Sequence, residues 1–424
     1  MKTPYKKYVL KNGMRIVLVP QAGAAAATVL MLVEAGSEYE TKDINGISHF
    51  LEHLCFKGTK KRPSSNVISS ELESLGASYN AFTGQQYTGY FAKVASGKLN
   101  DALDIVSDLY LNPVIDAGEL EKEKGVIIEE MNMYEDMPAR KVHENFYELL
   151  YGDQPAGWLI AGQKDVIRKM TRENVIAYRA AHYVPQATVV VVAGNFKQAP
   201  VLKRIKTLFA KMPAGVKSKK DPVKEMQTAP ASHVHFKASD QTHVVVGFRA
   251  FPLSDKRRFA LEVLSDILGG GMSSRLFHRL RDELGAAYYV NTGADLFTDH
   301  GFFAASAGID NARVQLVIEV IVEEFKKLKC VPVSAEELRK SKNHLTGKMQ
   351  LGLETSDALA SFYGDQEVLR SDIMSADKII KNIKSVTAKD VMNVARDLFI
   401  TKHLNVGMIG PLKELPPALK LSVD

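Results

Sequence analysis

The feature that most limits how this chain can fold is an internal repeat. Glu119–Met131 (ELEKEKGVIIEEM) aligns without gaps on Glu337–Met349 (ELRKSKNHLTGKM), at an offset of 218 residues, with Glu, Leu, two Lys and Met identical. Thr171–Gly194 aligns on Thr387–Gly410 at an offset of 216 residues. Two segments that recur in the same order at nearly the same offset predict two homologous halves of about 210 residues each.

Each half combines strand and helix signals. Asn12-Gly13 lies between two apolar runs, which predicts a β-hairpin. Ala24–Val33 and Val189–Ala193 are short apolar runs typical of buried strands. Helical periodicity dominates from residue 98 to residue 150. Strands and helices interleaved in this way predict a mixed α and β fold for each half.

A segment between the halves has the composition of a linker. Pro213–Ser232 (PAGVKSKKDPVKEMQTAPAS) lacks a sustained apolar period and contains three prolines. The chain of 424 residues is 46% hydrophobic and 25% charged, close to the globular average, so each half can build its own core. We expect domains at residues 1–212 and 233–424, joined by a linker at 213–232.

The composition limits which kinds of binding partner and which cellular compartment we expect for the protein. A net charge of +6 without a long basic run does not indicate nucleic-acid binding. Cys55 and Cys330 are the two cysteines and match no disulfide or zinc-ribbon spacing, which favours a reducing compartment. Met1–Val9 is polar and basic, unlike a secretory signal, and the apolar runs are too short to cross a bilayer. We expect a cytoplasmic protein that binds no nucleic acid and no membrane.

The stretch His49-Phe50-Leu51-Glu52-His53 is a candidate metal site within an expected helix at residues 46–56. Two histidines four residues apart share one helix face, so both imidazoles can bind one ion. Glu52 lies beside them, close enough to move the proton of a water molecule at that ion. His-x-x-Glu-His is the inverse of the commoner zinc-peptidase helix. The alternative is a chance grouping of two surface histidines and a carboxylate.

The repeat indicates where a third ligand lies. A catalytic zinc usually takes three protein ligands. In the aligned helices, Glu123 corresponds to Ser341 and Glu130 corresponds to Lys348, so these carboxylates differ between the halves. Both lie on a face with apolar neighbours, where burial is costly unless a positive charge compensates. We assign Glu130 as the ligand and Glu123 as the residue that orients a ligand histidine. The alternative is a charged helix whose carboxylates pair with lysines one turn away.

Three segments have a recognisable pattern: Gly46–Thr59 (GISHFLEHLCFKGT), Ser78–Phe82 (SYNAF) and Gly269–Val290 (GGGMSSRLFHRLRDELGAAYYV). Together they resemble the M16 peptidases, the inverzincin family that includes pitrilysin, insulin-degrading enzyme and mitochondrial processing peptidase. The spacing of 77 residues from His53 to Glu130 also matches, and the likeness covers nearly the whole chain. The chain is similar to the two-domain bacterial type. The resemblance implies an α+β fold of two homologous α/β sandwiches, each a largely antiparallel sheet covered by helices.

The resemblance also implies the chemistry. It points to a zinc-dependent endopeptidase with one Zn²⁺ per chain, bound by His49, His53 and Glu130. Glu52 would take a proton from the attacking water and deliver it to the leaving amine. A site of two histidines and a glutamate also accepts manganese or cobalt, so the sequence leaves the identity of the divalent ion open.

Arg281 and Tyr288 match the arginine and tyrosine of the family's second half. A guanidinium and a phenol suit the binding of a substrate carbonyl and of the oxyanion that forms from it. Without the resemblance, the pair reads as a helix-end arginine bonded to Glu283 and a core tyrosine. The family's clamshell has four such domains and this chain supplies two, which implies a homodimer in which Arg281 and Tyr288 act on the partner's metal site.

Asn80, Ala81 and Phe82 resemble the family's edge strand, which pairs with an extended substrate backbone by β-augmentation. The expected substrates are therefore short, extended or unfolded peptides, including presequences. Two alternatives stay open. One is a non-catalytic structural or partner subunit with the same fold, and the other is an active subunit that needs a different chain as its partner.

Overall fold

The computed structural model describes residues 5–370 and 372–424. Residues 1–4, the start of the polar segment Met1–Val9, lie outside the described residues. The chain forms two compact units. Unit 1 comprises Met1–Met131, Trp158–Asp221 and Gln350–Ser375, and unit 2 comprises Asn132–Gly157, Pro222–Met349 and Ala376–Asp424.

The two units exchange segments. The sequence predicted two contiguous domains instead, without such an exchange. Asn132–Gly157 comes from the first half but belongs to unit 2, and Gln350–Ser375 comes from the second half but belongs to unit 1. The change from unit 1 to unit 2 at Asp221 falls inside the expected linker. No helix or strand occurs from residue 213 to residue 230, and the next strand begins at Ala231.

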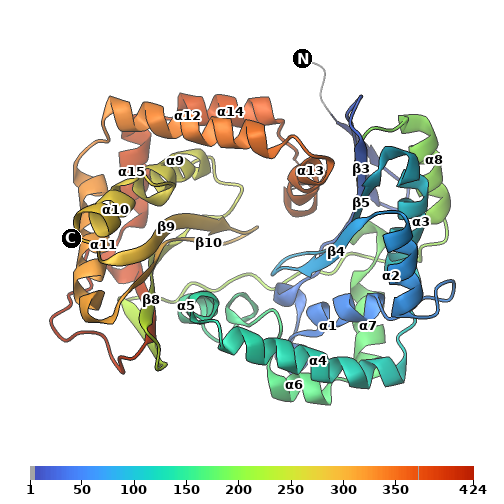
Figure 1. Cartoon of the computed structure of the whole chain (residues 1–424), viewed down its shortest axis with the longest axis horizontal. Helices are drawn as coiled ribbons and strands as arrows, with labels where there is room; N and C mark the ends of the chain where they lie inside the picture. The colour runs from blue at the N-terminus through green and yellow to red at the C-terminus, as the bar shows by residue number, and fades with distance from the viewer. Residues whose placement is uncertain (1–4, 371) are drawn as a thin grey trace. The chain divides into compact units, whose positions relative to one another are not determined.

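Unit 1 is built on a six-stranded sheet with the order β1-β2-β6-β3-β5-β4 (Figure 1). Its strands are β1 (Lys6–Val9), β2 (Arg15–Pro20), β3 (Ala26–Val33), β4 (Ser78–Thr83), β5 (Thr88–Ala95) and β6 (Thr188–Gly194). The β2–β6 pair is parallel and the other pairs are antiparallel. The hairpin predicted at Asn12-Gly13 joins β1 to β2, and Gly13 adopts the positive φ of 89° that such a turn needs.

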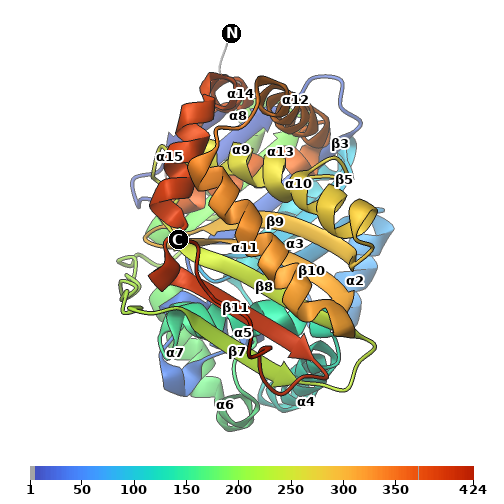
Figure 2. The ribbon, with the colours of Figure 1, turned by 90° about the vertical axis from the view of Figure 1, so that its left-hand side faces the viewer.

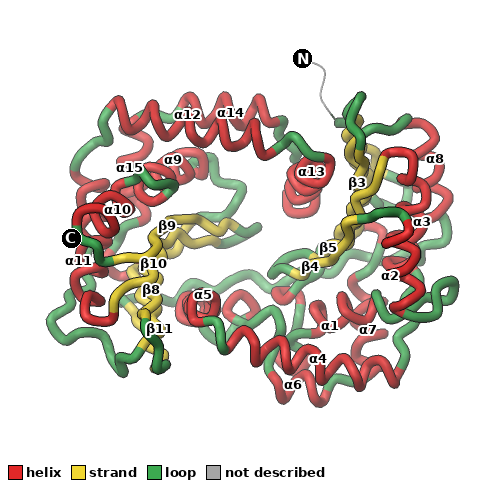
Figure 3. Tube along the Cα trace, viewed as in Figure 1, coloured by secondary structure: helices red, strands yellow, loops and turns green. Residues whose placement is uncertain are grey.

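The helices of unit 1 lie on both faces of this sheet. They are α1 (Ile47–Cys55), α2 (Ser65–Ser74), α3 (Leu99–Leu111), α4 (Ala117–Glu135, in unit 1 through Met131), α6 (Lys164–Lys169), α7 (Arg172–His182), α8 (Gln198–Leu208) and α13 (Ser356–Arg370). Figure 3 shows the sheet between α13 on one side and α3 and α8 on the other. The exchanged helix α13 therefore completes unit 1.

The side chains of strand β3 explain why helices pack on both faces of the unit 1 sheet. Its alternate residues Val29 and Met31 pack into the core on the side of α3, whereas Leu30 and Leu32 pack with Tyr363 of α13 on the opposite face. A strand with apolar side chains on both faces is stable only when both faces are buried. The run of apolar residues at 24–33 thus reflects a central strand, as predicted.

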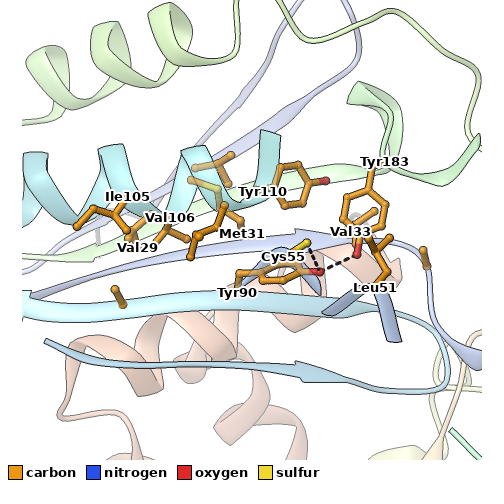
Figure 4. Close-up of a cluster of buried hydrophobic side chains, with 14 of the residues drawn as sticks. Val29, Met31, Val33, Leu51, Cys55, Tyr90, Ile105, Val106, Tyr110 and Tyr183 are labelled. Carbon is orange, nitrogen blue, oxygen red and sulfur yellow. Dashed lines mark hydrogen bonds between the residues drawn. The ribbon is translucent and has the colours of Figure 1, made fainter. Parts of the chain in front are cut away.

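A hydrogen-bonded group of buried side chains holds the C-terminal end of α1 against the core (Figure 4). The Tyr90 and Tyr183 hydroxyl oxygens are 2.8 Å apart, and the Cys55 thiol lies 3.5 Å from the Tyr90 oxygen. Burial raises the pKa of the Cys55 thiol to about 11, so this cysteine stays neutral near pH 7. The group anchors the last residue of α1 to the core.

Unit 2 repeats the same sheet with one strand fewer. Its order, β7-β11-β8-β10-β9, corresponds to β2-β6-β3-β5-β4 of unit 1, and its first pair is again parallel. The strands are β7 (Ala231–Phe236), β8 (Gln241–Ala250), β9 (Ala287–Leu296), β10 (Gly301–Asp310) and β11 (Leu404–Gly410). Thr171 and Thr387 cap equivalent helices with the same reciprocal hydrogen bonds. The predicted α+β fold with two homologous halves is confirmed.

The helices of unit 2 also lie on both faces of its sheet. They are α5 (Pro138–Tyr151), α9 (Arg258–Gly269), α10 (Arg275–Phe277), α11 (Val314–Cys330), α12 (Ala335–Gly352, in unit 2 through Met349), α14 (Ala376–Ser385) and α15 (Ala388–Leu398). Figure 2 shows α11 and α15 in front of the strands. The exchanged helix α5 packs Phe146 and Val142 against Val245 and Ile409. Among the described residues, no helix is long and apolar enough to cross a membrane.

Gly364 allows α13 to approach the sheet closely, which leads to a prediction about stability. A Cβ at Gly364 would lie 2.9 Å from Leu32 Cδ1 and 3.2 Å from Leu30 Cδ2. We expect Gly364→Ala to destabilise the protein by about 1–3 kcal/mol, because overpacking outweighs the better helix propensity of alanine. Gly347→Ala in α12 is the control, since its Cβ meets no atom within 4 Å. Urea unfolding curves that give Gly364→Ala the same midpoint as the wild type would contradict this account.

Candidate metal centre

The start of α1 is set by a buried carboxylate. Glu40 accepts hydrogen bonds from the backbone N–H of Gly46 at 2.7 Å and of Ser48 at 2.8 Å. These N–H groups have no partner within the helix, so the carboxyl oxygens of Glu40 satisfy them. Burial raises the pKa of Glu40, while these hydrogen bonds act in the opposite direction. Gly46 adopts a φ of 98°, and a Cβ there would lie 2.6 Å from the Ala161 carbonyl oxygen. The residue directly before α1 therefore has to be glycine.

The two histidines of α1 converge on Glu130 of α4. Phe50, Leu51 and Leu54 are fully buried in the core, which directs the opposite side of α1 towards α4. The Nε2 atoms of His49 and His53 each lie 3.5 Å from the Glu130 Oε2 atom. The structure thus brings together the three residues that the sequence predicts as ligands.

The donor set fits a divalent ion. The three ligand atoms of His49, His53 and Glu130 lie within 4.8 Å of one another. Atoms placed about 2.1 Å from a tetrahedral zinc ion are about 3.4 Å apart, close to the separations between each histidine and the carboxylate. Two imidazole nitrogens and one carboxylate oxygen are also a ligand set typical of catalytic zinc.

Glu123 lies behind this cluster and is only 3% exposed. Its Oε2 atom is 3.1 Å from His53 Nδ1, and its Oε1 atom accepts from Lys57 Nζ at 2.6 Å. Burial acts to raise the pKa of Glu123, but the bonds to His53 and Lys57 outweigh it and hold the pKa below its usual value. An ionised Glu123 accepts the Nδ1 proton of His53, which leaves Nε2 facing Glu130 as an acceptor. The geometry therefore suits the orienting role predicted for Glu123.

Lys57 was not among the residues singled out from the sequence. Its ammonium group compensates the buried charge of Glu123. The sequence does carry a weak signal, because this lysine follows directly after the end of the helix that carries the histidines. That position alone does not show which carboxylate the lysine meets.

Glu52 points from α1 towards β4. The Thr83 hydroxyl, at the end of β4, donates a hydrogen bond to Glu52 Oε2 at 2.5 Å. Burial raises the pKa of Glu52 above its usual value, while the Thr83 bond and the nearby His53 act in the opposite direction. A carboxyl group with a raised pKa beside a metal-binding cluster is suited to proton transfer near neutral pH. Thr83, like Lys57, was not predicted as a site residue.

Strand β4 ends the sheet of unit 1. It pairs with β5 on one side, and within the described residues no strand pairs with its other side. Asn80 is exposed, and Ala81 and Phe82 are half-buried. The Phe82 ring packs edge-on against Tyr87, with ring centroids 5.8 Å apart. The strand predicted to bind substrate is thus an edge strand, next to the residue that contacts Glu52.

Arg281 and Tyr288 lie together in unit 2. Arg281 Nη1 donates to the backbone carbonyl of Tyr288 at 2.9 Å, and its guanidinium lies over the Phe277 ring at 5.1 Å. The Tyr288 side chain is 57% exposed, so it is not a core tyrosine. Glu283 pairs with His278 at 3.3 Å. These contacts disfavour the purely structural alternative considered from the sequence, and the exposed Tyr288 ring is accessible to a ligand.

Unit 2 contains a counterpart of α1 that carries no histidine. Helix α9 lies between β8 and β9, as α1 lies between β3 and β4. Ser341, aligned with Glu123, donates to the Val263 carbonyl of α9 at 3.4 Å, and His344 bonds to Asp266 at 2.7 Å. The two units therefore share the arrangement of these helices and strands, whereas the cluster of His49, His53 and Glu130 lies in unit 1.

The fold and the site together define a two-domain protein of the M16 peptidase class, in which the first unit carries a cluster of two histidines and a glutamate. Residues 15–164 match the family model described as insulinase, peptidase family M16. Residues 169–345 match the model described as the peptidase M16 inactive domain. The chain belongs to the M16 peptidase family.

Individual relatives agree with this assignment. A Bacillus subtilis protein named as an uncharacterised zinc protease is 33% identical over 97% of this chain and 99% of its own length. A Streptomyces coelicolor protein with the same description is 34% identical over 96% of this chain and 90% of its own. A crystal structure of a Helicobacter pylori protease has a TM-score of 0.90 at 25% identity, with 96% of this chain and 99% of that one covered.

A further solved structure shares the fold alone. It is described as a peptidase M16 inactive domain from Pseudomonas fluorescens, and it matches with a TM-score of 0.89 at 16% identity. The match covers 98% of this chain and 100% of that one. The same two-unit fold therefore also occurs in a protein described as an inactive domain.

Proposed function

We propose that this protein is a zinc-dependent endopeptidase that hydrolyses short, extended or unfolded peptides. The observation that carries the proposal is the convergence of His49, His53 and Glu130, with the Glu52 carboxylate beside them. A structural subunit has no need of a complete ligand set with an adjacent proton carrier. The proposal assigns one Zn²⁺ to each chain.

In the proposed reaction, each residue has a separate task. His49, His53 and Glu130 would hold the ion, which supplies Lewis acidity to the scissile carbonyl and to the attacking water. Glu123 keeps His53 in the orientation and tautomer of a ligand. Glu52 takes the proton of the attacking water and delivers it to the leaving amine. Arg281 and Tyr288 would bind the carbonyl oxygen as negative charge develops on it.

The edge strand β4 supports the choice of substrate. An extended peptide can add to an open strand edge through backbone hydrogen bonds, which give affinity with little dependence on sequence. Asn80, Ala81 and Phe82 would form this contact, directly before Thr83, the hydrogen-bond partner of Glu52. Folded domains do not present such an extended backbone, so we propose short peptides, presequences and unfolded segments as substrates.

Cleavage of a quenched fluorescent peptide tests the proposal. The zinc-loaded protein should cleave the peptide, a chelator should abolish cleavage, and added zinc should restore it, because the ligands His49, His53 and Glu130 act only with an ion between them. Metal analysis should find one equivalent of zinc. A protein that binds zinc but cleaves no member of a varied peptide panel would instead favour the non-catalytic subunit.

We further propose a homodimer in which Arg281 and Tyr288 of one chain serve the metal site of the other. The metal cluster belongs to unit 1 and the arginine–tyrosine pair to unit 2. The chain supplies two of the four domains of the family's clamshell. The free thiols of Cys55 and Cys330 accord with the proposed cytoplasmic location.

Mixing two inactive variants tests the dimer. Glu52→Gln and Tyr288→Phe should each lower cleavage strongly, whereas subunit exchange between them should restore up to about a quarter of wild-type activity. Half of the dimers would then be mixed, with one intact site in each. The activity of the mixture, measured alongside its mass, checks this. Mixed dimers that form without any regain would rule out the trans arrangement, and a monomeric active protein would rule out the dimer.

A further inference from the structure

The hydroxyl of Thr83 makes a short contact with Glu52. Thr83 Oγ1 donates to Glu52 Oε2 at 2.5 Å, which is in the range of hydrogen bonds from a hydroxyl to a charged carboxylate. The bond occupies one carboxylate oxygen and leaves Oε1 for other partners. Without this bond, the three side-chain torsions of a glutamate allow several positions of the carboxylate.

The alternation of strand β4 explains why Thr83 faces α1. Tyr79 and Ala81 pack against the core that includes α1, whereas Phe82 packs on the opposite face of the sheet. Residues two apart in a strand share a face, so Thr83 points to the same side as Ala81. The alternation of side chains along β4 therefore places the Thr83 hydroxyl on the face that is turned towards Glu52.

The turn that follows β4 is held in place by backbone hydrogen bonds. The Ser37 N–H donates to the Gly84 carbonyl at 3.3 Å. The Glu38 N–H donates to the Gln85 carbonyl at 2.8 Å. Glu38 is itself buried and pairs with Lys220 at 3.0 Å. These bonds hold the backbone directly after Thr83 in place.

We propose that Thr83 is a positioning residue for Glu52, which links the substrate-binding edge of β4 to the proton carrier on α1. Thr83 follows directly after the residues proposed to pair with the peptide backbone. A peptide docked on β4 would thus lie at a set distance from a carboxylate held by the same strand. The inference rests on the proposed function, because it assigns a role within that reaction.

Three substitutions at position 83 test the inference. Thr83→Val keeps the shape and removes the hydroxyl, and a lost bond to a charged group should lower kcat by about ten- to a hundredfold, with KM changed less than about threefold. Thr83→Ser keeps the hydroxyl and should stay within about threefold of the wild type. Thr83→Ala against Thr83→Ser gives the same comparison if the valine variant does not fold. Zinc content should be unchanged in all three.

Peptide binding separates positioning from a merely structural effect. In a Glu52→Gln background, fluorescence titration with the same peptide should give equal Kd values with and without the additional Thr83→Val substitution, because no catalytic carboxylate is left to orient. If Thr83→Val weakened peptide binding by the same factor by which it lowered kcat, Thr83 would contribute to substrate binding, and the inference would be overturned. Equal kcat values for Thr83→Val and wild type would also overturn it. A zinc-loaded wild type that cleaves nothing would instead refute the proposed function.

Discussion

Glu52→Gln is expected to abolish peptide hydrolysis while the protein keeps its metal. The substitution preserves the size of the side chain and its ability to accept the Thr83 hydrogen bond, but it removes the group that can take up a proton. General acid–base catalysis contributes about 10²–10⁴-fold to rates, so kcat should fall by at least about a hundredfold. His49, His53 and Glu130 remain, so zinc content should stay at one equivalent.

A matched substitution separates this effect from a general loss of charge. Glu121→Gln removes an exposed carboxylate of unit 1 that pairs with Lys124 at 2.7 Å, outside the site. It should leave kcat and zinc content unchanged, since exposed pairs of this kind contribute about 0–1 kcal/mol. Near-wild-type turnover by zinc-loaded Glu52→Gln would show that another group carries the proton.

Some local elements of unit 1 were predictable because short-range patterns specify them. The hairpin at Asn12-Gly13 depends on two adjacent residues, and the spacing of His49 and His53 puts both on one face of any helix they form. Glu130 was found through the repeat, because a carboxylate replaced by Lys348 in the other half marks a difference in role. The structure places all three ligand candidates within bonding reach of one ion.

The exchange of α5 and α13 between the units was not predictable in the same way. The apolar faces of these helices show that each must be covered, but not which sheet covers it. Tyr363 of α13 packs on β3 of unit 1, although its segment lies within the second half of the chain. Phe146 of α5 likewise packs on the sheet of unit 2. Tertiary packing decides which sheet each helix covers, and a local sequence pattern does not contain this information.

Lys57 and Thr83 show the same limit within the site. Each is an ordinary surface-type residue in the sequence, and only the structure shows its contact with a carboxylate on another element. Burial makes these contacts matter, because a carboxylate removed from water needs a compensating donor or charge. The contacts of Lys57 and Thr83 are therefore set by tertiary geometry. The helical spacing of the two histidines in α1, in contrast, is visible in the sequence.

Glu130→Gln is the second substitution with a large expected effect, and it should remove the metal together with the activity. A neutral amide is a much weaker ligand than a carboxylate and does not compensate the charge of the ion. Loss of a residue that only orients a ligand costs about 10–100-fold in metal affinity, so loss of one of three ligands should cost more. Zinc titration against a competing chelator measures the affinity directly.

Glu129→Gln is the matched control, because Glu129 precedes Glu130 on the same helix but points about 100° away from it. The control should bind zinc and cleave peptide like the wild type. Circular dichroism should show both variants folded, since the hydrophobic contacts of α4 through Ile127 and Met131 are untouched. If Glu130→Gln kept wild-type zinc affinity, the third ligand would lie elsewhere, and Glu123, already within 3.1 Å of His53, would be the next residue to substitute.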